Sequence, residues 1–395
     1  MGGLIVLMIT AFVDMVGLLA VIPLLPYYAL RFGANGLIIG LLVSSFSVAQ
    51  LLAAPLWGRV SDRYGRRPAL LAGLAASAIA YVVFGFADSI WLLFLSRIVQ
   101  GAGGGTVSVV QAYVADATKP EDRAKALGWL SAATNLGVTI GPVLGSLTRG
   151  ISTEAPGLFA AGLCLVNIAF AFRFLPESRE TGGAPVGVKP VTSRAAIARV
   201  IAHSGEPASR LIWTYAIAMG AFQMLNAILA LFLARQFGVS ERAIGYFFMY
   251  VGAISVITRA LILGWMVDRL GEARLSRVGL GLMTASLVMM PLTHHLWTLA
   301  IAVALTPLGT AFTFPCVTGM LSQVIAKHER GLYLGVQQTF AGVARVLAPI
   351  WAGFAWDHLG TAVPFWTGAL LVAGTFFLGV GMEGYVRRPA KVRVA

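Results

Sequence analysis

Asp14 is an acidic side chain in the middle of a long apolar stretch, and proton binding is the chemistry that such a group could perform. It is the one charged residue in positions 4–30. A carboxylate at membrane depth must be paired, protonated or turned towards water, and each option makes it a functional candidate. Arg97 lies in another apolar stretch at a similar expected depth. We expect Asp14 and Arg97 to interact and to couple proton movement to conformational change. The alternative is a static ion pair that holds two helices together.

Polar side chains recur on single helical faces within other apolar stretches. Residues three, four or seven apart lie on one face of a helix, where they either contact a substrate or form interhelical hydrogen bonds. The face that begins at Arg97 also carries glycines, so it either lines a cavity or packs against the first helix. The candidate substrate contacts are Gln100, Gln111, Gln223, Asn226, Gln338 and Arg345.

Two arginines in the second half differ in expected depth. Arg345 lies near the middle of its apolar stretch with no carboxylate at the same depth. With Asp14 and Arg97 also ionised, the deep interior carries one net positive charge, which favours an anionic or zwitterionic solute. Arg259 is expected about one turn from the cytoplasmic end of its helix, where a long side chain reaches the interface.

Two short polar segments have nearly the same sequence. The first contains Gly58, Asp62, Gly65 and Arg66, and the second contains Asp268 and Arg269, with Asp268 following Asp62 by 206 positions. Glycines accept positive φ, so Gly58 and Gly65 are expected to turn the chain between two helices. The spacing, about half the chain, indicates one membrane unit used twice.

Three glycines lie four residues apart in a later apolar stretch. Gly137, Gly141 and Gly145 leave one helical face without side chains, and Pro142 lies between them. Such a face allows close helix packing, and the proline allows bending. Ser146 follows the last of these glycines.

The composition is that of a polytopic membrane protein. Apolar residues make up 58% of the 395 residues and charged residues 11%. Runs of about 20 apolar residues predict twelve transmembrane helices. The expected spans are 4–30, 36–57, 69–87, 90–114, 124–148, 155–175, 209–234, 243–266, 276–293, 296–325, 332–355 and 362–385.

The net charge of +13 is explained by topology and not by nucleic-acid binding. Most Lys and Arg fall in alternate loops, which by the positive-inside rule places both termini in the cytoplasm. We therefore expect a multi-pass protein of the plasma (inner) membrane. The expected domains are an N-terminal six-helix lobe over 1–175, a cytoplasmic linker over 176–208 and a C-terminal six-helix lobe over 209–395. Residues 194–203 of the linker form either a short amphipathic helix or a disordered tether.

Three features together resemble the major facilitator superfamily: the two similar polar segments, the predicted helix that contains Arg97, and the predicted helix with the three glycines. The sequence Asp14-Met-Val-Gly17 with Pro23-Leu-Leu-Pro26 resembles the first helix of its twelve-helix drug:proton antiporters, including the tetracycline-efflux group. The resemblance implies that Asp62 and Asp268 each face the start of a helix in the other lobe, forming a conformational latch that opens during transport. It also implies that Arg66 pairs with Asp116.

The expected function is secondary active transport by alternating access, with proton-coupled efflux of a drug-like or amphipathic molecule. A symporter or uniporter of a sugar or organic anion is the alternative. A membrane enzyme, a lipid scramblase or a non-transporting sensor are further readings with less support. No enzyme activity and no cofactor are expected, since the proton gradient supplies the energy. The expected partners are a small-molecule substrate and the lipid bilayer, not nucleic acid, and the protein is expected to be a monomer.

Overall fold

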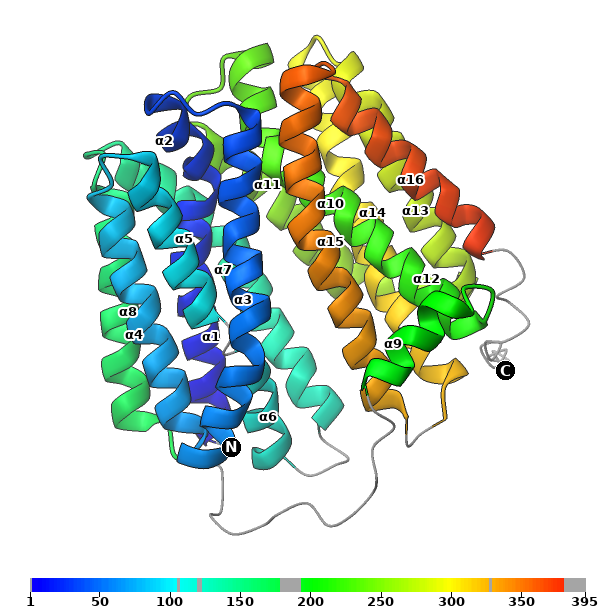
Figure 1. Cartoon of the computed structure of the whole chain (residues 1–395), viewed down its shortest axis with the longest axis horizontal. Coiled ribbons are helices and arrows are strands. Elements are labelled where there is room, and N and C mark those ends of the chain that lie inside the picture. The colour runs from blue at the N-terminus through cyan, green and yellow to red at the C-terminus, as the bar shows by residue number, and fades with distance from the viewer. Residues whose placement is uncertain (1, 105–106, 119–122, 178–192, 327–328, 380–395) are drawn as a thin grey trace. The chain divides into compact units, whose positions relative to one another are not determined.

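The computed structural model describes residues 2–104, 107–118, 123–177, 193–326 and 329–379 (Figure 1). Within these ranges the chain is helical and contains no strand. Eleven of the described helices are long and apolar enough to cross a membrane. A twelfth apolar helix, Val363–Gly379, is shorter, and the last residues of the predicted twelfth span lie outside the described ranges. The all-helical membrane architecture is confirmed.

The chain divides into two compact units. The first comprises 1–185 together with 229–256, and the second comprises 186–228 together with 257–395. Residues 229–256 therefore belong with the first unit although they lie in the second half of the sequence. Most of the predicted linker, 178–192, lies outside the described ranges.

The first unit contains the helices of the first half of the sequence, joined by α11. The predicted first span is interrupted where Pro23 enters a short 3₁₀ turn, so it becomes three consecutive pieces. The elements are α1 (Gly2–Val21), η1 (Ile22–Leu24), α2 (Leu25–Arg31), α3 (Gly36–Tyr64), α4 (Arg66–Gly85), α5 (Ile90–Gly104), α6 (Val107–Ala117), α7 (Arg123–Arg149), α8 (Ala155–Phe174) and α11 (Ile244–Ile257).

The second unit contains the remaining helices and shares α10 with the first, since the boundary falls within that helix. A π-helical segment follows α11 directly. The elements are α9 (Ser193–Ala202), α10 (Pro207–Phe237), η2 (Thr258–Ile262), α12 (Leu263–Leu270), α13 (Glu272–Met289), η3 (Met290–Leu292), α14 (Leu296–Val324), α15 (Arg330–His358) and α16 (Val363–Gly379).

The glycine face of α7 packs directly on α1, as the spacing predicts. A Cβ added to Gly137 would lie 2.6 Å from the carbonyl oxygen of Phe12, and one added to Gly141 would lie 2.7 Å from that of Val16. At Gly145 a Cβ would overlap the carbonyl of Ala20. The helix continues through Pro142. Glycine at these positions therefore fixes the distance between α7 and the helix that carries Asp14.

The two similar polar segments each place one glycine at the turn. Gly65 has φ 103° and Gly271 has φ 76°, and each separates two helices. Gly58 is not a turn residue: it lies within α3, which continues to Tyr64. The expected role of Gly58 was wrong because polar residues extend α3 beyond its apolar part, and a hydropathy pattern does not detect where a polar helix ends.

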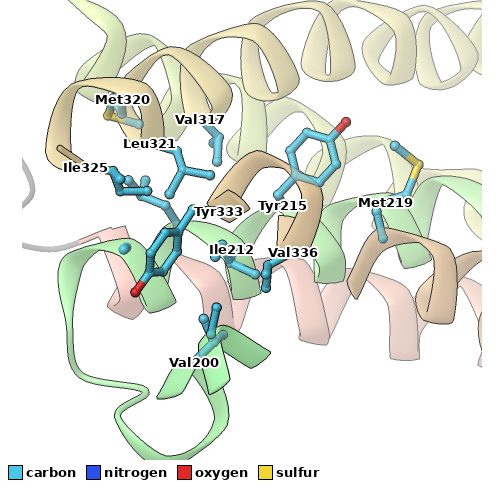
Figure 2. Packing of buried hydrophobic residues seen from close by; sticks show 14 residues of the cluster. Val200, Ile212, Tyr215, Met219, Val317, Met320, Leu321, Ile325, Tyr333 and Val336 are labelled. Carbon is cyan, nitrogen blue, oxygen red and sulfur yellow. The ribbon is translucent and has the colours of Figure 1, made fainter. Parts of the chain in front are cut away.

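The linker helix α9 packs on the second unit through its apolar face. Ala196 and Val200 are buried in a cluster with residues of α10, α14 and α15, including Ile212 and Val336. Figure 2 shows Val200 pointing towards Ile212 and Val336, with Tyr215 at the other side of these residues and its hydroxyl pointing away from them. The amphipathic-helix reading of residues 194–203 is therefore confirmed, since α9 covers Ser193–Ala202.

Candidate functional site

Asp14 lines a cavity inside the first unit. The cavity has a volume of about 280 Å³ and is bounded by α1, α4, α6 and α7. Gln111 lines the same cavity, so the structure brings together two of the residues singled out in the sequence. The remaining lining residues are Leu7, Thr10, Ala11, Met15, Leu70, Leu74, Val110, Leu130, Ser131 and Thr134. Asp14 therefore borders open space and is not enclosed on every side by packed side chains.

Arg97 is buried and is not paired with Asp14. Its side chain is 1% exposed. Among the described residues no ion pair joins the two, and the buried Nε and Nη2 of Arg97 have no hydrogen-bond partner. The guanidinium lies 6.0 Å from the centre of the Phe84 ring. The expectation of a direct contact is therefore wrong for this conformation, and so is the static ion pair.

Tyr81 of α4 is near both charged groups. Its hydroxyl interacts with both the Asp14 carboxylate and the Arg97 guanidinium. The hydroxyl also packs against α1, since a Cβ added to Gly17 would lie 3.7 Å from its oxygen. Tyr81 was not singled out in the sequence, because a lone tyrosine in an apolar helix carries no spacing signal.

The polar and glycine face of α5 packs against α3 and not against α1. A Cβ on Gly101 would overlap the carbonyl of Phe46, and the Gln50 side chain donates a hydrogen bond of 3.1 Å to the carbonyl of Gly104. Gln100 is 2% exposed, and its amide lies beside the Tyr81 hydroxyl. This face of α5 is therefore mainly a packing surface, because small residues let two helices approach closely.

The polar candidates of the second half lie on α10 and α15. The Arg345 guanidinium donates a hydrogen bond of 3.4 Å to the Gln338 side chain, so these two residues are together as their spacing predicts. Asn226 donates to the carbonyl of Phe222 in its own helix, at 3.0 Å. Gln223 lies one turn before Asn226, and both are partly buried.

Arg259 lies in a helix that continues further than the sequence predicts. The helix does not end near position 266 but continues through the π segment and α12 to Leu270, four residues further and eleven residues after Arg259. At about 1.5 Å per residue this places Arg259 about 16 Å from the end of α12. Its Nε is buried without a hydrogen-bond partner among the described residues. The expectation that it reaches the membrane interface stays a prediction.

The second unit also contains an apolar cavity of about 500 Å³ between α9, α10, α15 and α16. It contains none of the polar candidates, because Gln338 and Arg345 face away from the residues of α15 that line it. The lining residues are Ile197, Ile201, Trp213, Ala216, Ile217, Gly220, Ala221, Met224, Thr339, Phe340, Val343, Ala344, Leu347, Ala348, Trp351 and Leu371.

The first polar segment forms an ion-pair cluster around Arg66. Its guanidinium contacts Asp62 at 2.8 Å (Nη1 to Oδ1) and Asp116 at 2.9 Å (Nε to Oδ2), so the predicted pairing with Asp116 is confirmed. The Glu177 carboxylate accepts hydrogen bonds from the backbone N–H groups of Arg66 and Arg67 at the start of α4. The anion there satisfies free donors at a helix N-terminus.

The second polar segment has the same geometry with different charges. Glu272 follows Arg66 by 206 positions and Gln323 follows Asp116 by 207. The Gln323 side chain donates a hydrogen bond of 2.8 Å to the Glu272 carboxylate. Asp268 is exposed, and the Arg269 guanidinium stacks 4.0 Å from the centre of the Trp265 ring. The latch partners predicted for Asp62 and Asp268 belong to the other unit, so that contact stays a prediction.

Glu241 is a charged residue that the sequence did not reveal. Its carboxylate forms ion pairs with Arg31 and with Arg149, the latter at 2.8 Å from Nε to Oε2. All three belong to the first unit. In the sequence Glu241 is one acid in a short polar loop, which looks like solvated charge.

Ser146 connects α7 to α11. Its hydroxyl accepts a hydrogen bond of 2.9 Å from the backbone N–H of Gly245 and donates one of 3.3 Å to the carbonyl of Glu241. Gly252 also packs closely on α7, since a Cβ there would lie 2.7 Å from the Thr139 hydroxyl. The serine that follows the glycine series is therefore part of a helix contact.

No group of three or more potential metal ligands lies close together in the described part of the chain. The site residues instead form two polar regions, one in each unit. The first contains Asp14, Tyr81 and Arg97, and the second contains Arg259 and Arg345. Charged residues within membrane-spanning segments typically mark pathways for ions or polar solutes.

Comparison with known proteins agrees with this arrangement. A family model described as Major Facilitator Superfamily matches residues 7–258 and 211–393. The class B tetracycline resistance protein of Escherichia coli is 27% identical, over 94% of this chain and 92% of its own. Multidrug resistance protein 1 of Bacillus subtilis is 27% identical, over 99% of this chain and 97% of its own. The crystal structure of the human organic anion transporter MFSD10 superposes with a TM-score of 0.71 and 25% identity, covering 95% of this chain and 98% of that chain.

Proposed function

This chain belongs to the major facilitator superfamily, and on that premise we propose that it exports a drug-like or amphipathic small molecule in exchange for protons. The proposed mechanism is alternating access, in which the binding region opens first to one side of the membrane and then to the other. The proton gradient is the proposed energy source, with no cofactor. We further propose that the protein acts as a monomer in the plasma (inner) membrane with both termini in the cytoplasm.

The observation that carries the proposal is the position of Asp14. Its carboxylate borders a cavity and has no ion-pair partner among the described residues. A carboxylate in that environment can gain and lose a proton as access to water changes. Arg97 is close enough to affect Tyr81, which also interacts with Asp14. Movement of α4 against α1 would therefore change the charge environment of Asp14.

Relatives support an efflux function without fixing the substrate. Two of the similar proteins are a tetracycline resistance protein and a multidrug resistance protein. The glycine face of α7 lets this helix pack closely on α1, the helix that carries Asp14.

An exchanger or symporter of an organic anion is the second candidate. It is favoured by Arg97 and Arg345, which have no carboxylate partner among the described residues. A solved relative is an organic anion transporter.

The decisive experiment uses the full chain in liposomes that contain a pH-sensitive dye. Under an imposed proton gradient, added tetracycline or another hydrophobic drug should release protons, and Asp14→Asn should abolish that release. Asp88→Asn is the matched control, since Asp88 is exposed in a loop between α4 and α5. Unchanged proton release in Asp14→Asn would contradict the role of Asp14. Exchange of a labelled organic acid without drug-induced proton release would favour the second candidate.

A further inference from the structure

We propose that Arg259, Arg345 and Tyr215 form the subsite of the second unit that binds an acidic group of the transported molecule, a carboxylate or an equivalent oxyanion. This inference rests on the proposed transport function and names the substrate class. The three residues lie on three separate elements of the second unit: the π segment, α15 and α10. Tyr215 packs on Phe314 of α14, and the π segment that carries Arg259 also contacts α14. Arg259 and Arg345 are each close enough to the Tyr215 hydroxyl to interact with it electrostatically.

The two guanidinium groups lack negative partners. No described acidic residue lies within ion-pair distance of either one. The Nε of Arg259 is buried without a hydrogen bond, and Arg345 has only the long contact of 3.4 Å to Gln338. Buried charges are stable when an opposite charge or a set of hydrogen bonds compensates them. Two partly buried cations near one hydroxyl, neither with an acidic partner among the described residues, therefore indicate a site for an anion.

The backbone at Arg259 supports a binding role. Thr258–Ile262 is a π-helical segment between α11 and α12. Such segments are rare, and they occur frequently at functional sites because they change the direction of one or two side chains. Here the wider turn falls at the arginine itself. An ordinary α-helix would have carried Arg259 to a different angle relative to Tyr215.

The chemistry of the three side chains selects a carboxylate. A guanidinium presents two parallel N–H groups that match the two oxygens of a carboxylate. Tyr215 adds an O–H donor, and its ring packs against Phe314 with centroids 5.0 Å apart. Phe222 also packs on Phe314, at 6.3 Å. The site thus places aromatic rings beside the cations, a combination suited to an aromatic or amphipathic acid.

The test is equilibrium binding of two probes of the same shape to the purified full-length protein. Naphthalene-2-carboxylate carries the acid, and naphthalene-2-carboxamide replaces it with a neutral amide. We expect the carboxylate to bind more tightly. Arg259→Gln and Arg345→Gln should each weaken carboxylate binding about ten- to hundredfold, the usual effect of losing a hydrogen bond to a charged group, and should leave amide binding unchanged. Lysine at either position should restore part of the affinity.

Two controls separate binding from folding. Arg242→Gln removes the same charge from an exposed loop and should leave both affinities unchanged. Thermal unfolding of each variant shows whether it is folded. If Arg259→Gln does not fold, Tyr215→Phe, which removes one donor and keeps the ring, replaces it and should weaken carboxylate binding severalfold.

Equal binding of the two probes, or unchanged carboxylate binding in the folded arginine variants, would overturn the proposal. It would mean that the arginines bind backbone carbonyls only. That failure differs from failure of the efflux function: drug-induced proton release that depends on Asp14 would persist. Conversely, loss of all drug-induced proton release with retained carboxylate selectivity would contradict efflux and retain the anion subsite.

Discussion

The Arg149 guanidinium and the Glu241 carboxylate form an ion pair, with Nε 2.8 Å from Oε2, and this pair joins the end of α7 to the loop before α11. Arg31 binds the same carboxylate from the end of α2. One acid thus connects three segments at the end of the first unit that the topology predicts to be extracellular. If α11 separates from α7 during transport, these contacts must break in each cycle.

Removing the acid should therefore favour the open form on the predicted extracellular side. Glu241→Gln loses two partly exposed ion pairs, and we expect a shift of about 1 kcal/mol in the conformational equilibrium. The measurement is the labelling rate of a cysteine introduced at Ile244, which is fully buried in this structure, and that rate should rise about fivefold. Cys164 and Cys316 are buried and should not react. An unchanged labelling rate would mean that the ion pairs are incidental. Exchanging the charges of Glu241 and Arg149 should restore the rate only in part, because Arg31 would then face a second arginine.

The close packing of the α7 glycines on α1 leads to a prediction about thermal stability. Gly145→Ala places a methyl group on the carbonyl of Ala20, so the helices must separate, and such overpacking costs about 1–3 kcal/mol or more. We expect a clear fall in Tm in detergent and reduced transport. Gly128→Ala is the control in the same helix, because nothing lies within 4 Å of its added Cβ. Alanine is the better helix former, so Gly128→Ala should maintain or raise Tm.

The connection at Ser146 can be tested by removing one hydroxyl. Ser146→Ala leaves the N–H of Gly245 without its acceptor, and loss of such a bond costs about 1 kcal/mol. We expect a lower Tm and faster labelling at the same introduced cysteine. Thr148→Ala is the control, because the Thr148 hydroxyl bonds only carbonyls of its own helix. Equal effects of the two substitutions would show that the bond between α7 and α11 has no special importance.

Substituting Arg66 should lower the transport rate more than substituting its counterpart Glu272. Arg66→Ala leaves Asp62 and Asp116 without their shared cation, whereas Glu272→Gln retains a side chain that accepts a hydrogen bond from Gln323. We expect a severalfold lower transport rate in Arg66→Ala and a small change in Glu272→Gln, at equal expression. Arg63→Ala, a neighbouring substitution at an exposed position, is the control. Comparable rates for Arg66→Ala and Arg63→Ala would contradict a specific role for the cluster.

Much of the fold follows from hydropathy, because apolar runs of the required length identify membrane helices. The helix ends do not follow: α3 continues seven residues past its predicted end at position 57, since Arg59, Asp62 and Arg63 are compatible with a helix in water. The helix that carries Arg259 likewise continues past its predicted end, to Leu270. Nothing in the apolar pattern of residues 244–270 marks the π segment.

The sequence identifies those residues of the candidate site that carry a charge within an apolar stretch. Asp14 and Arg345 stand out because each is a charge in an apolar run, and the structure places Asp14 at a cavity. Tyr81 and Tyr215 do not stand out, since tyrosine is acceptable at almost any depth, yet each interacts with charged groups of its unit. The missing Asp14–Arg97 pair was unpredictable for another reason: similar depth does not determine which side of a helix faces which neighbour.

The pairs Arg66–Asp116 and Gln323–Glu272 occupy matching positions in the two halves, yet the acid lies on opposite members of the pair. If both halves descend from one duplicated gene, the charge has changed places while the bond between the two helices persisted. Both positions of the pair have therefore been substituted since the duplication, and each intermediate protein had to remain functional. The ancestral half must have tolerated a neutral or mismatched pair for a time, so selection acted on the link between these helices and not on the sign of the charge that makes it.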